Sequence, residues 1–254
     1  MPMDGQKWMI NKAIEKVWDL LGPIFFPTRC PVCDEILSPE EIENRIHNIC
    51  KKKLYFISGS ACLHCGRPLE NAIAEYCLEC QKKRLSYITQ GKALCLYRGA
   101  IKKSMYRFKY SNRREYARYF AREIVKNYGG WIRQRKINLI VPVPMYEKKK
   151  RRRGYNQVET LARELSRILD IPVETKTVRR IKDTTPQKEL NDIERKNNLK
   201  NAFQIDKSIV QYSHILVVDD IYTTGSTAEA VAEEMIKTGV SQVYMMSICI
   251  GKDM

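Results

Sequence analysis

Short apolar runs alternate with longer amphipathic stretches along most of this 254-residue chain, and this pattern predicts an α/β protein. Runs rich in β-forming residues predict strands at 92–97, 138–144, 173–178, 215–218 and 242–250. Helical patterns fill 101–128, 157–169 and 227–237, and Gly239 follows the last of them as a helix-ending residue. The run at 215–218 is apolar throughout, which is typical of a buried parallel strand. We therefore expect a mostly parallel central sheet.

The first 26 residues predict a separate amphipathic helix. Residues 6–21 carry apolar side chains at spacings near three and four, and Gly22-Pro23 ends the pattern. Such a helix can lie on a membrane surface or pack on a neighbouring domain. Its polar face carries both Lys and Glu and lacks a strong basic bias, so we favour packing. No stretch of the chain has the length and apolar character of a transmembrane segment.

The charge and the cysteines narrow the class of protein. The net charge of +16 favours polyanionic partners, such as nucleic acid, anionic lipid or phosphorylated small molecules. Nine cysteines could form disulfides in a secreted protein, but the N-terminus lacks a secretory pattern. Seven of the nine are clustered, three times as Cys-x-x-Cys. We therefore expect a cytoplasmic protein that binds zinc.

Residues 27–88 form a cysteine module in which two metal sites are expected. Cys62-Leu-His-Cys65 and Cys77-Leu-Glu-Cys80 flank eleven residues, the spacing of a zinc ribbon with a closed tetrahedral site. In the first half, Cys30-Pro-Val-Cys33 is a clear pair, but its partner pair is Cys50-Lys-Lys-Lys53. His47 precedes Cys50 by three residues, so Cys30, Cys33, His47 and Cys50 could form a Cys₃His site. A lost or weak first site is the alternative.

The strongest chemical pattern of residues 89–254 follows the strand at 215–218. Asp219 and Asp220 come at its carboxyl end, and a small, hydroxylated loop then opens the last helix; its residues are Thr223, Thr224, Gly225, Ser226 and Thr227. Backbone N–H groups at a helix N-terminus favour a phosphate, and hydroxyls add donors. The two carboxylates can accept hydrogen bonds from ribose hydroxyls, directly or beside Mg²⁺. The pattern predicts a ribose 5-phosphate site and resembles the phosphoribosyl pyrophosphate motif of type I phosphoribosyltransferases.

Two basic segments extend this picture. Lys148–Arg153 precedes Gly154 at a strand-to-helix turn, which makes Arg153 a candidate for binding pyrophosphate, with a solvated loop as the alternative. In the second segment cations are interleaved with aromatic residues: Arg98, Lys102, Lys103, Arg107, Lys109, Arg113, Arg114 and Arg118 with Tyr97, Tyr106, Phe108, Tyr110 and Tyr116. Such rings can stack on the bases of single-stranded DNA while the cations follow its phosphates. A basic helix whose rings face the core is the equal alternative.

The polar stretch 180–203 is expected to be a flap over the ligand, with Gln187 and Arg195 among its residues. The order of the motifs then resembles the ComF family of competence proteins. The motifs include Tyr97-Arg-Gly99, Phe108-Lys109, Val141-Pro-Val-Pro144, Arg153-Gly-Tyr-Asn-Gln157, Gln187-x-x-Leu190 and Arg195-x-x-Asn198. The resemblance implies a double zinc ribbon before a phosphoribosyltransferase-type domain. It also implies a role in bringing transforming DNA into the cytoplasm, beside a helicase-like partner at the inner face of the membrane. Lys53 departs from the family, which usually has cysteine there.

Besides a zinc-ribbon scaffold with an inactive transferase domain, the sequence leaves two functions open. One is a competence factor that binds single-stranded DNA and phosphoribosyl pyrophosphate. The other is a metabolic phosphoribosyltransferase that transfers ribose 5-phosphate to a base or amine. In that enzyme Asp219 and Asp220 would hold the ribose and Mg²⁺, and Arg153 and Lys109 would stabilise the departing pyrophosphate. Only one helix and one strand are expected after the phosphate loop, which leaves no segment for a base-recognition hood.

Overall fold

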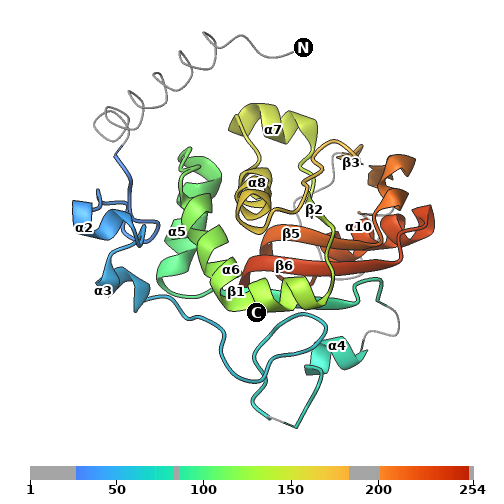
Figure 1. The fold of residues 1–254 in the computed structure, drawn as a ribbon, viewed down its shortest axis with the longest axis horizontal. Helices are drawn as coiled ribbons and strands as arrows, with labels where there is room; N and C mark the ends of the chain where they lie inside the picture. Colours follow the sequence, from blue (N-terminus) through green and yellow to red (C-terminus); the bar gives the residue numbers. More distant parts are fainter. Residues whose placement is uncertain (1–26, 72, 83–85, 183–198, 200, 252–254) are drawn as a thin grey trace.

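A four-stranded parallel sheet lies at the centre of the computed structural model (Figure 1). The structure describes residues 27–71, 73–82, 86–182, 199 and 201–251. The strands are β1 (Gln90–Leu96), β2 (Leu139–Pro142), β5 (His214–Tyr222) and β6 (Gln242–Ile250), in the order β1-β6-β5-β2. All three neighbouring pairs are parallel. The expected α/β fold with a parallel sheet is confirmed.

Helices cover both faces of the sheet, as the apolar strands require. On β5, Leu216 and Val218 point into the core formed with α5 (Ala100–Tyr110), α6 (Tyr116–Gln134) and α8 (Gln157–Leu169). Ile215 and Val217 point into the core on the other face, which includes α10 (Ser226–Thr238) and the antiparallel pair of β3 (Val178–Arg180) and β4 (Phe203–Ile205). This alternation gives successive residues of β5 different neighbours.

The remaining elements are short. They are α2 (Pro39–Ile42), α3 (Asn48–Lys51), α4 (Leu78–Lys82), α7 (Glu147–Arg153) and the 3₁₀ helix η2 (Lys207–Gln211). Within the described part of the chain, no helix has both the length and the apolar character that a membrane span needs.

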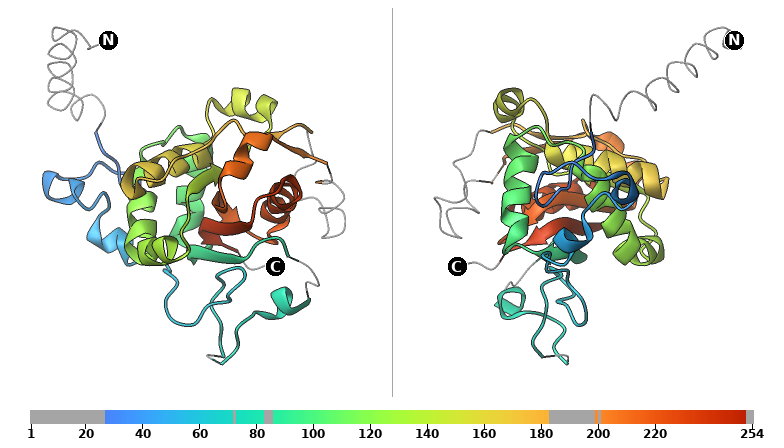
Figure 2. Two further views of the ribbon diagram at one scale, coloured as in Figure 1. Left: turned by 45° about the vertical axis from the view of Figure 1, so that its right-hand side comes forward. Right: turned by 90° about the vertical axis from the view of Figure 1, so that its left-hand side faces the viewer.

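The cysteine module is divided between the two cores. Cys30 and Val32 of its first half belong to the core of α5, α6 and α8, whereas Cys62 and Cys65 of its second half belong to the core of α10. Figure 2 shows the first half beside the helices and the second half below the sheet. The linker between them, at Phe56, bridges to Cys95 and covers the edge of β1.

Three details differ from the sequence expectations. β5 continues through Tyr222, because residues 219–222 pair with β6 after β2 has ended at Pro142. The basic run at 148–153 forms α7 instead of a loop. In 173–178, only Val173 bridges to β2, and the strand β3 starts at Val178. The N-terminal helix expected in residues 1–26 and the flap residues Gln187 and Arg195 lie outside the described residues.

Candidate functional site

The two carboxylates lie at the carboxyl end of the sheet, where parallel α/β proteins bind their ligands. The last residue of β5 that pairs with β2 is Val218, so from Asp219 onward β5 has no pairing with β2. Because Asp219 and Asp220 are consecutive strand residues, their side chains point to opposite faces of the sheet. The two carboxylates therefore lie in different environments, one on each face of the sheet.

Asp220 points toward α5 and α8 and is buried there. The Nζ atom of Lys109, from α5, lies 3.1 Å from its Oδ1. The side-chain amide of Gln157, from α8, donates a hydrogen bond to its Oδ2. Burial alone would lower the pKa of Lys109, but the charges of Asp220 and Asp219 outweigh this effect and raise it. Lys109 is therefore a permanent cation at the site.

Asp219 is half-buried on the other face, and its Oδ1 accepts a hydrogen bond of 2.8 Å from the backbone N–H of Asp220. Burial, and secondly the charge of Asp220, raise the pKa of Asp219 to about 7. Lys109 and Arg180 oppose this rise. Two adjacent carboxylates with a single close lysine cannot both ionise easily, so Asp219 titrates near neutral pH.

The loop after β5 forms a small cavity of about 40 Å³ together with Asp219. Gly225 is the N-cap of α10 with φ of 77°, a conformation that glycine adopts without strain. A Cβ atom at this position would also overlap the ring and hydroxyl of Tyr222. The Thr224 and Ser226 hydroxyl oxygens lie 2.8 Å apart, on the side of the loop that leads into the helix. The loop thus has the backbone shape and the donors of an anion site.

Tyr222 lines the same cavity; it lies within the motif that follows the strand at 215–218, but no role for its side chain was predicted from the sequence. Its side chain is buried, and no group among the described residues forms a hydrogen bond with its hydroxyl. A buried hydroxyl without a partner is costly, so an oxygen-rich ligand in the loop would supply a missing acceptor. The buried, unpartnered hydroxyl therefore lies beside the cavity that the loop lines.

Arg153 joins the Asp220 side of the site through Gln157. Its Nη1 atom donates to the Gln157 Oε1 over 2.6 Å, and its guanidinium lies 4.8 Å from the ring centroid of Tyr110. Gly154 ends α7 in the left-handed conformation, and Asn156 then caps α8 by accepting from the Val158 N–H. These two turns place Arg153 and Gln157 on the same side of the site.

The predicted residues therefore form two groups. Lys109, Asp220 and Arg153 lie on the helical side and are connected by Gln157, whereas Asp219 lies with the loop at 223–227. Gln157 belongs to one of the sequence motifs but was not expected at the site. Its sequence signal is a long amide directly after a helix-capping Asn, at the start of an amphipathic helix.

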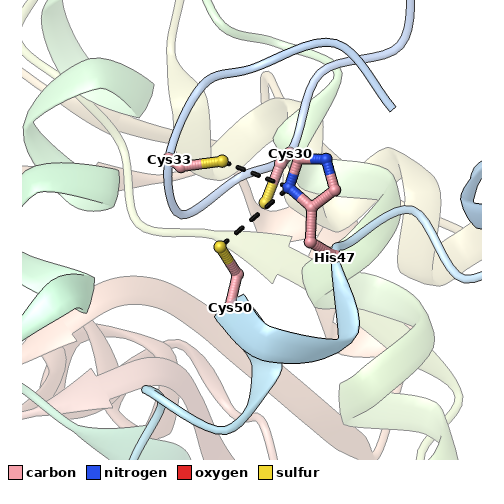
Figure 3. A group of neighbouring side chains, drawn as sticks. All are labelled: Cys30, Cys33, His47 and Cys50. Atoms are coloured by element: carbon pink, nitrogen blue, oxygen red, sulfur yellow. Dashed lines mark hydrogen bonds between the residues drawn. The ribbon is translucent and has the colours of Figure 1, made fainter. Parts of the chain in front are cut away.

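The first cysteine cluster is shown in Figure 3. The ligand atoms of Cys30, Cys33, His47 and Cys50 all lie within 4.8 Å of one another. His47 points its Nδ1 toward the thiols, 3.2 Å from Cys33 Sγ, and its Nε2 lies 3.5 Å from a carboxylate oxygen of Glu41. A carboxylate behind a ligating imidazole is the usual support of a zinc-bound histidine. The donor set fits Zn²⁺ in a closed Cys₃His site.

The second cluster, Cys62, Cys65, Cys77 and Cys80, brings four thiols together in the same way and fits a Cys₄ zinc site. Every cysteine lies in the described residues, and all are free of disulfides. His64, between the first two ligands, is buried, and its Nε2 lies 3.0 Å from Glu229 Oε1. Glu229 belongs to the first turn of α10, and its carboxylate also accepts from Ser86 and from the Tyr87 N–H. The second ribbon is thus connected through His64 to α10, the helix that follows the loop.

Comparisons with known proteins match two parts of the chain to family models. A family model described as "Double zinc ribbon domain" matches residues 21–81, and one described as "Phosphoribosyl transferase domain" matches residues 156–252. The chain is 33% identical over 231 residues to "Competence protein F" of Haemophilus influenzae, covering 88% of this chain and 97% of that protein. It is 24% identical over 210 residues to "Competence protein ComFC" of Bacillus subtilis, covering 80% and 82%. It is 38% identical over 110 residues to "DNA utilization protein YhgH" of Escherichia coli, covering 43% and 48%.

Proposed function

Because this chain belongs to the ComF family of competence proteins, with a double zinc ribbon and a phosphoribosyltransferase domain, we propose that it binds phosphoribosyl pyrophosphate and single-stranded DNA during DNA uptake. The observation that carries the ligand is the cavity shared by Asp219 and the loop at 223–227, with the orphaned Tyr222 hydroxyl beneath it. A sugar phosphate offers hydroxyls to the carboxylate and phosphate oxygens to the loop.

In this proposal the 5-phosphate binds the loop. The N–H groups at the start of α10 and the hydroxyls of Thr224 and Ser226 donate to its oxygens. Asp219 accepts hydrogen bonds from the ribose hydroxyls, and Thr223 and Thr227 complete the loop around the phosphate. Mg²⁺ would accompany the ligand and neutralise part of the pyrophosphate charge.

The pyrophosphate end is assigned to the cations of the helical side. Lys109 is bound to Asp220 in the free protein, and Arg153 is bound to Gln157. Both cations are held at the edge of the site by groups that can release them, so phosphate oxygens can replace those partners. Asp220 then keeps the hydrogen bond from Gln157, and the contacts of Lys109 with the pyrophosphate must offset the loss of the ion pair. Lys109 and Arg153 therefore bind the most highly charged part of the ligand.

The DNA role rests on charge and on the relatives. The chain has a net charge of +16, which supports binding to a phosphate backbone. Two relatives carry the names of competence proteins and one that of a DNA utilization protein. We place this chain in the cytoplasm at the inner face of the membrane, where a helicase-like partner would deliver or accept the strand.

Calorimetric titration with phosphoribosyl pyrophosphate and Mg²⁺ tests the ligand. Asp219→Asn should weaken binding about tenfold or more, since a hydrogen bond to a charged group contributes about 1.5–3 kcal/mol. Gly225→Ala should abolish binding because its Cβ would overlap Tyr222. Gly130→Ala, at an open position of α6, and Glu233→Gln, in a surface pair of α10, are the matched controls. Wild-type affinity in both site variants would refute the assignment.

A second function is transfer of ribose 5-phosphate to a base or amine. It is favoured because the site has cations at the pyrophosphate end in addition to the phosphate loop. Stabilising departing pyrophosphate requires such cations. Release of pyrophosphate in the presence of a panel of bases and amines would show turnover. Binding without release across the panel would support a ligand-sensing role.

A further inference from the structure

The exposed face of α5 carries two tyrosines whose side chains lie outside the protein core. Phe108 and Tyr116, from the same basic segment, are buried in the core. Tyr106 and Tyr110 are instead 63% and 60% exposed, and their ring centroids lie 5.1 Å apart. Each of the two alternatives that the sequence left open therefore holds for part of this segment. Some of its rings lie in the core, and one adjacent pair faces solvent.

Cations flank this pair at both ends. Lys102 and Lys103 are exposed one turn before Tyr106 on the same helix. At the other end, the Arg153 guanidinium lies 4.8 Å from the ring centroid of Tyr110. Alternating cations and exposed rings on one face are what a single strand requires, because its bases stack while its phosphates need positive charge.

The cationic end of this face continues into a cavity of about 460 Å³ between α5 and the first zinc ribbon. Lys53, Lys103 and Arg107 line it, together with the start of α5 at Gly99. Lys53 occupies the position at which a fourth cysteine would be expected, and His47 joins the metal cluster in its place. This exchange leaves a lysine directed toward the cavity instead of a metal ligand.

We propose that this face, from Lys53 through Lys103, Tyr106 and Tyr110 to Arg153, is the single-stranded DNA surface of the protein. The inference rests on the proposed function for its DNA partner and adds where the strand lies. Two bases stack on the two tyrosines, and the flanking phosphates contact the lysines of α5 and the cavity. Duplex DNA does not fit this arrangement, because its bases are already stacked and paired.

The surface leads from the first zinc ribbon to the phosphoribosyl site. Arg153 contacts both Tyr110 and Gln157, and Gln157 donates to Asp220. Arg113, although it belongs to the same basic segment, is not part of the surface. Its guanidinium forms two hydrogen bonds with Asp34, at 2.8 and 2.9 Å, and attaches the first ribbon.

The test measures binding of an oligothymidylate by fluorescence anisotropy across a range of salt concentrations. Tyr106→Leu with Tyr110→Leu should weaken binding about tenfold or more with an unchanged salt slope, since only stacking is removed. Tyr106→Phe with Tyr110→Phe should bind like the wild type. Lys102→Gln with Lys103→Gln should reduce the salt slope by roughly 0.7 for each phosphate that the protein no longer neutralises.

Tyr76→Leu is the matched control, because Tyr76 is 43% exposed on the second ribbon, away from this face. An unchanged midpoint of urea unfolding in the double leucine variant shows that the fold is intact. If the wild type binds the strand and the double leucine variant binds equally well, the surface is wrong while the proposed function stands. If the wild type fails to bind at low salt, the DNA part of the proposed function fails and this inference with it.

Discussion

Lys109→Met tests the centre of the site, because it removes the cation that neutralises the buried Asp220. The Lys109 Nζ lies 3.1 Å from Asp220 Oδ1, and the lysine side chain is 23% exposed. Removing one partner of a buried ion pair costs about 3–5 kcal/mol. Lys109 is partly solvated and Gln157 still donates to Asp220, so we expect a loss of about 2–3 kcal/mol in the free energy of unfolding.

A double-mutant cycle separates this pair from general damage. Asp220→Asn removes the negative charge, so adding it to Lys109→Met should recover part of the lost stability. We expect a coupling of about 1 kcal/mol or more between the two substitutions, well above the roughly 0.5 kcal/mol within which independent sites add. Urea unfolding of the four proteins measures it. Lys126→Met, a substitution on the surface of α6, is the control for removal of a positive charge.

Ligand binding distinguishes the role of Lys109 from that of Asp220. If Lys109 moves to the pyrophosphate, Lys109→Met should weaken binding of phosphoribosyl pyrophosphate about tenfold or more. Ribose 5-phosphate, which lacks pyrophosphate, should lose little affinity. Additive stability effects, together with equal losses for both ligands, would show that Lys109 neither supports Asp220 nor contacts the pyrophosphate.

Three further results are expected. Affinity for phosphoribosyl pyrophosphate, measured by calorimetry, should fall about tenfold between pH 8 and pH 6, because Asp219 has a pKa of about 7 and accepts ribose hydrogen bonds fully only when ionised. The Asp219→Asn variant should show only the smaller pH dependence that comes from the ligand phosphates. Elemental analysis should find two zinc ions per wild-type chain and one per chain of His47→Ala. Two zinc ions in that variant would show that His47 is not a metal ligand. Cys77→Ser should also lose one zinc and, through the contact of His64 with Glu229, weaken the binding of phosphoribosyl pyrophosphate.

The fold and the metal clusters were readable from the sequence because their signals are local. The strand at 215–218 and the helix ending at Gly239 follow from apolar period and turn chemistry, and the structure contains both. The cysteine spacing predicted which thiols lie together. The spacing of His47 and Cys50 likewise identified the fourth member of the first cluster, despite the lysine at position 53.

The contacts between distant segments could not be predicted from the sequence. Nothing local indicates that Gln157 lies beside Asp220, because their contact depends on how α8 packs against the sheet. The length of β5 was underestimated for a similar reason: residues 219–222 are held in the strand by pairing with β6. The contact of His64 with Glu229 spans the zinc module and α10, so it forms only when the two are folded together.

These long-range contacts suggest why a zinc module accompanies this domain. The first ribbon contacts α5 where Arg107 donates to the Val32 carbonyl, and the same helix carries Lys109. The second ribbon contacts the start of α10 through His64 and Glu229, directly after the phosphate loop. Each ribbon therefore supports one half of the site, on its own side of the sheet. Because four metal ligands fix a short segment more firmly than its small core could, zinc held by these clusters would make each support rigid. The module would then position the cations of α5 and the loop of α10 for the proposed ligand, which would contact both.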